Sequence, residues 1–152
     1  MITIDDSVMQ TFDSLILHDL PITNLSLFFE EKKAVLVLEE YNDLTDSYQP
    51  LTLSFLGLNK FISKYPDKYE FSVIGCKDAT CKKTKDGEYE VLFALEMKDG
   101  QPVYSLTIGF TSFTVNRTLS DKALEYKKAN LATRYEKMEW FEKNNLVLPE
   151  WV

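Results

Sequence analysis

Apolar and polar residues alternate over most of this chain, which is the period of a β-strand with one buried face. The alternation covers residues 25–29, 51–55, 71–73, 91–97, 104–110 and 113–115, and a short apolar run covers 34–38. A charged turn at 30–33 and two Asp-Gly steps, at 86–87 and 99–100, separate such runs and are typical of hairpins. Tight turns join antiparallel strands, so the pattern predicts a curved or partly closed antiparallel meander of about six to eight strands.

The pattern changes to a helical period near Ser120. Residues 121–143 contain neither Gly nor Pro, and Leu124, Leu131, Tyr135 and Met138 recur at helical spacing. Ser120, or Thr118 with Asp121, can cap the start, and residues 144–145, both Asn, can end the segment. We therefore predict one long C-terminal helix over about 120–144, packed on the sheet in an α+β fold.

Three shorter segments leave alternatives open or extend this picture. Val8, Met9, Phe12, Leu15 and Ile16 fit a short N-terminal helix, although 15–17 can equally enter a strand. Residues 58–65 predict one helical turn before Pro66. The tail 146–152 is apolar, so we expect it to be ordered, with Trp151 buried against its own domain or a second copy in a homodimer.

Length and composition indicate one globular domain over residues 1–152. The N-terminus lacks the charged and apolar regions of a signal peptide. No run approaches the roughly 18 apolar residues that a membrane span needs. We expect a cytoplasmic protein that does not bind membranes.

The charge is concentrated at the beginning of the chain. The first fifty residues carry ten acidic side chains against two lysines, whereas the net charge of the whole chain is −7. An acidic face favours cationic partners and disfavours nucleic acid. The lysines between 77 and 85 are expected to lie on a solvated hairpin, where they discourage edge-to-edge strand pairing. We expect a basic protein partner and no nucleic acid.

His18 is the one histidine of the chain, and Asp19 follows it. A histidine beside a carboxylate can act as a general base or a metal ligand. Neighbouring side chains often point apart, so we favour a structural role, with the imidazole bonded to the backbone of a turn or strand. No nucleophile motif accompanies the pair, and we expect no enzymatic activity.

Cys76 and Cys81 flank four residues, a spacing that suits two thiols facing each other across a hairpin. Zinc normally needs four ligands. A site formed by the two cysteines, His18 and Asp78 is conceivable, but two free thiols are the favoured interpretation. We expect no metal and no cofactor.

The stretch 39–48 gathers acids and aromatics directly after the apolar run at 34–38. It does not have the spacing of a calcium-binding EF-hand loop. It is interpreted either as a solvated acidic loop or as a protein-binding surface, because tyrosines among charges can anchor a partner. The residues concerned are Glu39, Glu40, Tyr41, Asp43, Asp46 and Tyr48.

The segment from Leu17-His18-Asp19 through the charged turn to 34–39 resembles the opening of small bacterial β-rich domains of uncharacterised function. In those domains a His-Asp pair precedes a first hairpin, and some are assigned as immunity proteins of toxin systems. The resemblance covers residues 15–58, and His18 and Asp19 are the matching positions. The family's usual small residue after the pair is replaced by Leu20 and Pro21.

These features predict a protein-binding module, immunity-like, that holds a cationic partner through its acidic N-terminal half. The partner-contacting candidates are His18 and Asp19 together with the acids and tyrosines of 39–48. The alternative is a carrier of a small apolar ligand in a β-barrel-like cavity, because a curved sheet rich in Phe and Tyr can enclose one.

Overall fold

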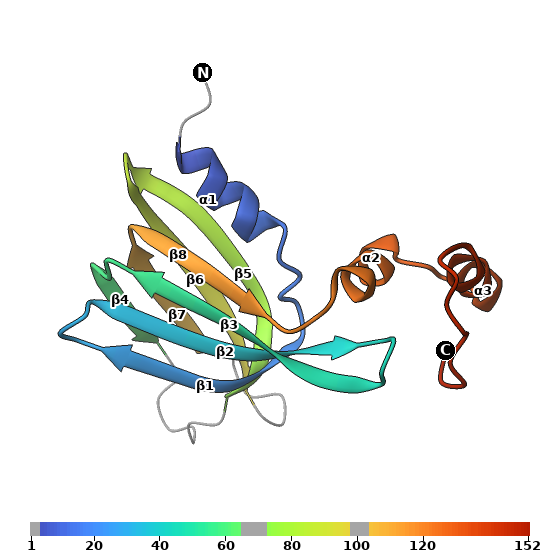
Figure 1. Cartoon of the computed structure of the whole chain (residues 1–152). Helices are drawn as coiled ribbons and strands as arrows, with labels where there is room; N and C mark the ends of the chain where they lie inside the picture. Colours follow the sequence, from blue (N-terminus) through green and yellow to red (C-terminus); the bar gives the residue numbers. More distant parts are fainter. Residues whose placement is uncertain (1–3, 65–72, 98–103) are drawn as a thin grey trace. The chain divides into compact units, whose positions relative to one another are not determined.

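The computed structural model describes residues 4–64, 73–97 and 104–152. Within these ranges eight strands form one sheet in the order β4-β7-β6-β5-β1-β2-β3-β8 (Figure 1). The strands are β1 (Leu20–Phe28), β2 (Lys33–Asn42), β3 (Ser47–Leu56), β4 (Lys60–Lys64), β5 (Val73–Lys85), β6 (Glu88–Met97), β7 (Tyr104–Phe110) and β8 (Ser112–Arg117). The helices are α1 (Ile4–Asp13), α2 (Asp121–Ala129) and α3 (Arg134–Lys143). The predicted α+β class with an antiparallel sheet is confirmed, but β4 and β8 are separate edges, so the sheet is not closed.

The chain divides into two compact units. The sheet unit comprises Met1–Glu39 and Leu51–Asn116, and the helical unit comprises Glu40–Pro50 and Arg117–Val152. The distal part of the β2–β3 hairpin therefore belongs with the two C-terminal helices. The expectation of a single domain stays a prediction.

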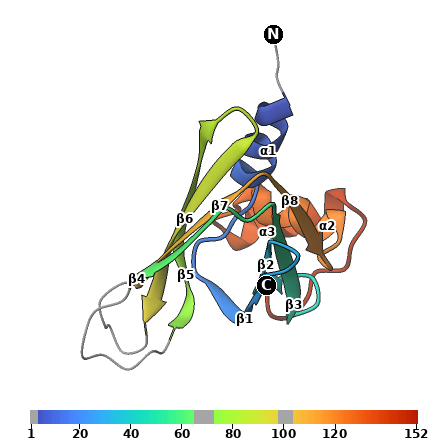
Figure 2. The same cartoon turned by 90° about the vertical axis from the view of Figure 1, so that its left-hand side faces the viewer.

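The sheet unit consists of two walls that share one short junction. Strands β4, β7, β6 and β5 form one wall, and β1, β2, β3 and β8 form the other, as Figure 2 shows. The described pairing between the walls joins Leu20 to Cys76 and Pro21 to Gly75. A Cβ on Gly75 would lie 2.9 Å from the carbonyl oxygen of Leu20, so glycine lets the two backbones approach here.

Aromatic side chains fill the space between the two walls at one end. The ring of Phe55 on β3 lies 6.1 Å from that of Phe93 on β6 and 5.0 Å from that of Phe110 on β7. Phe12 of α1 adds an edge contact with Phe113 of β8. The alternating pattern of the sequence thus places its large apolar side chains in one core, as β-strand periodicity requires.

The predicted long helix is wrong, because the structure has two short helices in its place. Asn130 ends α2 with a left-handed backbone (φ 49°), and Thr133 caps α3 by accepting a hydrogen bond from the backbone N–H of Glu136. The Glu136 carboxylate accepts in turn from the N–H of Ala132. A Thr-x-x-Glu sequence is a helix-start signal, and it outweighs an apolar spacing that continues through the break. The predicted cap at Ser120 is confirmed.

Several local predictions can be compared directly with the described residues. The hairpins at the charged turn 30–33 and at Asp86-Gly87 are confirmed. Residues 4–13 form helix α1, as predicted for Val8, Met9 and Phe12, whereas 15–17 lie in neither the helix nor a strand. The helical turn predicted for 58–65 is wrong where it is described, because 60–64 pair with β7 as a strand. The run at 71–72 and the Asp-Gly step at 99–100 lie outside the described residues.

The C-terminal tail is held by polar contacts more than by burial. The indole N–H of Trp151 donates to the backbone oxygen of Asp43 at 2.7 Å, and the guanidinium of Arg134 donates to the backbone oxygen of Val152. Trp151 nevertheless stays 50% exposed and Val147 91% exposed. The expectation that Trp151 is substantially buried is therefore wrong within this chain, and a homodimer through the tail stays a prediction.

Candidate functional site

The structure divides the predicted site residues between two places in the chain. His18 and Asp19 form the turn that precedes β1 in the sheet unit. The residues of 39–48 lie on the β2–β3 hairpin, and from Glu40 onward they belong to the helical unit. We call residues 40–48 the hairpin tip.

Glu40 is buried, and it is already paired. Its side chain is 2% exposed and forms an ion pair with the Arg117 guanidinium, which donates from two nitrogens. A buried carboxylate needs such a partner because desolvation penalises its charge. The interpretation of Glu40 as part of a solvated loop or a partner surface is therefore wrong.

The other predicted site residues of the hairpin tip contact one another or helix α2. The Asp43 carboxylate lies 3.8 Å from Lys127 Nζ. The hydroxyl of Tyr41 donates to Asp46, and this hydrogen bond raises the pKa of Tyr41 to about 12. Tyr48 packs edge-on against Tyr41 at 5.4 Å and is 60% exposed, so it keeps an aromatic face in solvent.

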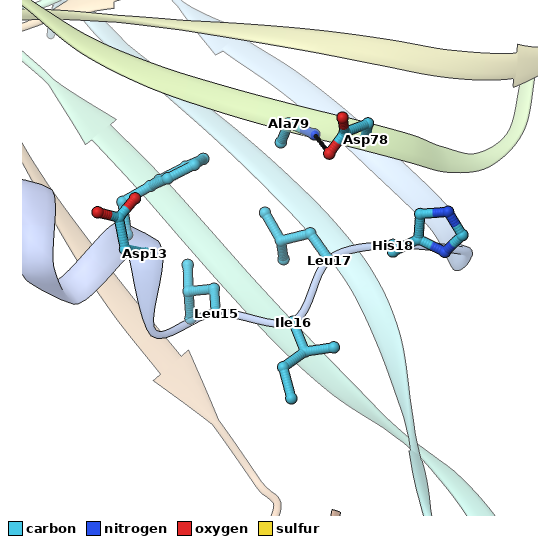
Figure 3. A pocket seen from close by; sticks show the side chains of 8 residues that line it. Asp13, Leu15, Ile16, Leu17, His18, Asp78 and Ala79 are labelled. Atoms are coloured by element: carbon cyan, nitrogen blue, oxygen red, sulfur yellow. Dashed lines mark hydrogen bonds between the residues drawn. The ribbon is translucent and has the colours of Figure 1, made fainter. Parts of the chain in front are cut away.

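A second place brings His18 together with two acids, Asp13 and Asp78, that are not among the predicted partner-contacting residues. A hollow of about 310 Å³ lies between the segment that joins α1 to β1 and strand β5 (Figure 3). We call it the rim pocket. Its lining is formed by Phe12, Asp13, Leu15, Ile16, Leu17, His18, Asp78 and Ala79.

Local packing determines how this segment presents its side chains. Phe12 and Leu17 are buried in the core and anchor the two ends of the connection. Between them Ile16 is exposed, and in Figure 3 it points away from Leu15 and Leu17. The apolar residues of the segment are thus shared between the core and the floor of the rim pocket.

His18 and Asp19 form an exposed pair at one end of the rim pocket. His18 Nδ1 lies 2.7 Å from Asp19 Oδ2, and the side chains are 67% and 65% exposed. Asp19 has a left-handed backbone (φ 64°), and its N–H donates to the carbonyl of Cys76 on β5. The imidazole therefore contacts a carboxylate, whereas we expected a backbone bond. The pair leaves Nε2 for another partner if Nδ1 carries the proton.

Asp13 and Asp78 approach the rim pocket from opposite sides (Figure 3). Asp13 is the last residue of α1, and Asp78 lies on β5, where its carboxylate accepts from the N–H of Ala79 at 2.8 Å. Both residues are exposed, and among the described residues neither forms an ion pair with a lysine or arginine. The rim pocket thus combines an apolar floor with carboxylates that lack a cation.

A bulge in β5 explains the position of Asp78 and of both cysteines. Cys76 pairs with Leu95 and Asp78 with Ala94, so Lys77 is the extra residue. Residues five positions apart on a regular strand point to opposite faces. Because the bulge adds one residue between them, both Cys76 and Cys81 face the core. The prediction that the two thiols face each other across a hairpin is wrong, because both lie on one strand. Both are free.

Burial raises the pKa of each thiol to about 11. The second contribution is a nearby negative charge, which is Asp78 for Cys76 and Asp13 for Cys81. Thiols with raised pKa values are poor nucleophiles and poor metal ligands near neutral pH. These two cysteines therefore act as small apolar residues of the core.

The described part of the chain shows neither a metal-binding cluster nor a membrane-spanning helix. It contains no group of three or more His, Cys, Asp or Glu side chains placed to hold a metal ion. Its helices also lack the length and apolar content that are needed to cross a bilayer.

Asp13 was not predicted as a site residue and entered the sequence analysis only as one of the ten acidic side chains. One signal did point to it: a carboxylate at the C-terminal end of a helix opposes the helix dipole, so such an acid tends to have another reason for its position. Asp78 was considered only as a conceivable zinc ligand, and its place at the rim pocket could not be predicted, because it depends on the bulge at Lys77. Comparison of this chain with protein-family models, with curated proteins and with solved structures finds no match in any of the three.

Proposed function

We propose that this chain is a protein-binding module that holds a basic partner by receiving a lysine or arginine side chain in the rim pocket. The observation that carries this proposal is that, among the described residues, Asp13 and Asp78 form no ion pair with a lysine or arginine. Both flank an apolar-floored hollow and lack a cation among the described residues, whereas Glu40 and Asp43 have theirs.

A long cationic side chain suits both parts of the rim pocket. Its aliphatic stem can lie on the half-buried Leu15, while its charged end meets the carboxylates. Because Asp13 and Asp78 are exposed, each ion pair with the incoming cation is worth about 0.2–1 kcal/mol. The exposed His18–Asp19 pair adds a polar contact at the end of the pocket.

The resemblance of residues 15–58 to immunity-like domains supports a toxin as the class of partner. Its matching positions, His18 and Asp19, lie at the rim pocket and beside it. A basic toxin would be steered towards the acidic N-terminal half, so its association rate would fall as salt rises.

A titration with a hexa-arginine peptide at low salt tests the pocket itself. We expect amide NMR shifts to concentrate at residues 12–19 and 76–79. The double variant Asp13→Asn/Asp78→Asn should abolish them, because Asn keeps the shape and the acceptor oxygen but removes the charge. The matched control is Glu30→Gln/Glu31→Gln, which removes two charges from the exposed β1–β2 turn and should leave the shifts in place.

The physiological test uses a purified basic protein encoded next to the gene of this chain. We expect binding that weakens with salt and falls at least tenfold in Asp13→Asn/Asp78→Asn, but by less than threefold in the Glu30→Gln/Glu31→Gln control. Equal losses in the two variants would show that net charge, and not the rim pocket, determines binding.

A further inference from the structure

A separate cavity lies between the two walls of the sheet unit, and its volume is about 360 Å³. This value lies within the range of about 300–1,000 Å³ that is usual for small-molecule sites. β1 and β2 contribute one side and β6 and β7 the other, and the hollow opens to solvent at Thr23, Asn24 and Leu25. We call it the wall cavity. Its described lining is formed by Ile22, Thr23, Asn24, Leu25, Leu36, Leu95, Tyr104 and Leu106.

The course of β1 explains why space opens here. β1 pairs with β5 at Leu20 and Pro21, and its register on β2 then shifts between Ile22 and Asn24. Such an irregularity bends a strand. The bent part of β1, with Ile22 and Leu25, forms one side of the wall cavity.

The two ends of the core are filled differently. At one end the rings of Phe55, Phe93 and Phe110 meet across the gap between the walls. At the wall cavity leucine and isoleucine side chains line the same gap together with Tyr104. Its open apolar surface comes from the half-buried Ile22 and the exposed Leu25, because the leucines of the core are almost fully buried. The remaining space corresponds to about twelve water volumes at roughly 30 Å³ each, which is room for a chain of about ten heavy atoms.

The lining selects against charge. Among its described residues there is no Asp, Glu, Lys, Arg or His. The two small polar side chains at its edge already donate, Thr23 to the carbonyl of Val37 at 3.2 Å and Asn24 to Ser26 Oγ at 3.0 Å. A charged ligand group inside this cavity would lose its hydration without gaining an opposite charge.

We propose that the wall cavity binds an uncharged aliphatic chain of about ten heavy atoms, such as a medium-chain alcohol or acyl ester. A mostly aliphatic lining accepts a flexible chain, and the lack of charged side chains among the described lining residues disfavours a fatty-acid anion. This binding is independent of the partner proposed for the rim pocket, since the two sites share no residue.

The test is a thermal-shift and NMR titration of the full chain with 1-octanol, 1-decanol and sodium decanoate. We expect saturable stabilisation by the alcohols, with affinity rising about fourfold per added methylene until the cavity is full. Decanoate should bind at least tenfold more weakly than decanol. Absence of concentration-dependent stabilisation by either alcohol would overturn the proposal.

Two filling variants and one matched control locate the binding. Leu95→Phe fills the wall cavity from β6, and Leu25→Phe fills it from the partly exposed side, where extra volume is tolerated best. Leu92→Phe makes the same change on the 49% exposed side of β6. Decanol should stabilise the parent chain and Leu92→Phe but not Leu25→Phe. If Leu95→Phe does not fold, the test rests on Leu25→Phe. Equal shifts of the melting temperature by decanol in Leu25→Phe and Leu92→Phe would contradict the assignment.

Discussion

The hairpin tip and the rim pocket both draw their carboxylates from an acidic chain, yet they use them in opposite ways. In the hairpin tip Glu40 is buried against Arg117, and Asp43 lies near Lys127. In the rim pocket Asp13 and Asp78 are exposed around an apolar floor. A carboxylate whose cation lies within its own chain stabilises the fold, whereas one without a cation is free to recognise a partner. Net charge alone does not distinguish the two cases.

The largest expected effect comes from breaking the buried pair of the hairpin tip. Arg117→Met leaves the Glu40 carboxylate buried without its cation and should lower the free energy of unfolding by about 3–5 kcal/mol in denaturant titrations. Lys127→Met is the control, because its contact with Asp43 is longer and partly exposed, and it should cost less than about 1 kcal/mol. Similar costs for the two variants would remove the distinction between buried and surface pairs here.

A smaller effect is expected where the tail contacts the hairpin tip. Trp151→Ala removes the hydrogen bond to the Asp43 backbone and half-buried apolar surface, and should cost about 1–2 kcal/mol. In a chain of this length that lowers the melting temperature by roughly 2–8 °C. Val147→Ala, at a 91% exposed position, should change nothing measurable. Size-exclusion chromatography of Trp151→Ala also tests the homodimer, since a tail-mediated dimer should dissociate.

Near the rim pocket, alkaline pH should weaken the fold through the two buried thiols. Their pKa values rise from 9.0 to about 11 in the folded chain, so the unfolded chain loses these protons first. Stability is therefore complete below pH 9 and falls as the pH rises towards 11. Unfolding measured from pH 8 to 11 should show this slope, and Cys76→Ala/Cys81→Ala should flatten it. An unchanged slope in the double variant would assign the effect to other groups.

The smallest effect on stability is expected at the rim pocket itself. Asp13→Asn/Asp78→Asn should change the free energy of unfolding by no more than about 0.5 kcal/mol, because neither carboxylate forms an ion pair among the described residues. Asn at 78 keeps the acceptor for the N–H of Ala79. A loss above about 1 kcal/mol would mean that these acids stabilise the fold, and the contrast with the hairpin tip would fail.

The sequence by itself determined the β-rich class, the hairpins at 30–33 and 86–87, and the helical cap at Ser120. These features depend on residues that are neighbours along the chain, where alternation, turn chemistry and capping act directly. Local residues also determine the break between α2 and α3, because Asn130 ends α2 and Thr133 with Glu136 begins α3. The apolar spacing continues across this break, so the sequence pattern predicted a single helix.

Only the tertiary structure decided which acids are paired and which side chains share a pocket. Glu40 meets Arg117, 77 residues later, and Asp78 reaches the rim pocket because a bulge at Lys77 changes the alternation of β5. Neither position follows from local propensity, since a long-range contact depends on strand order and a one-residue shift reverses the face of every following side chain. The wall cavity has the same origin: within the described residues β1 pairs with β5 at Leu20 and Pro21 and then takes a different path, where its register on β2 shifts.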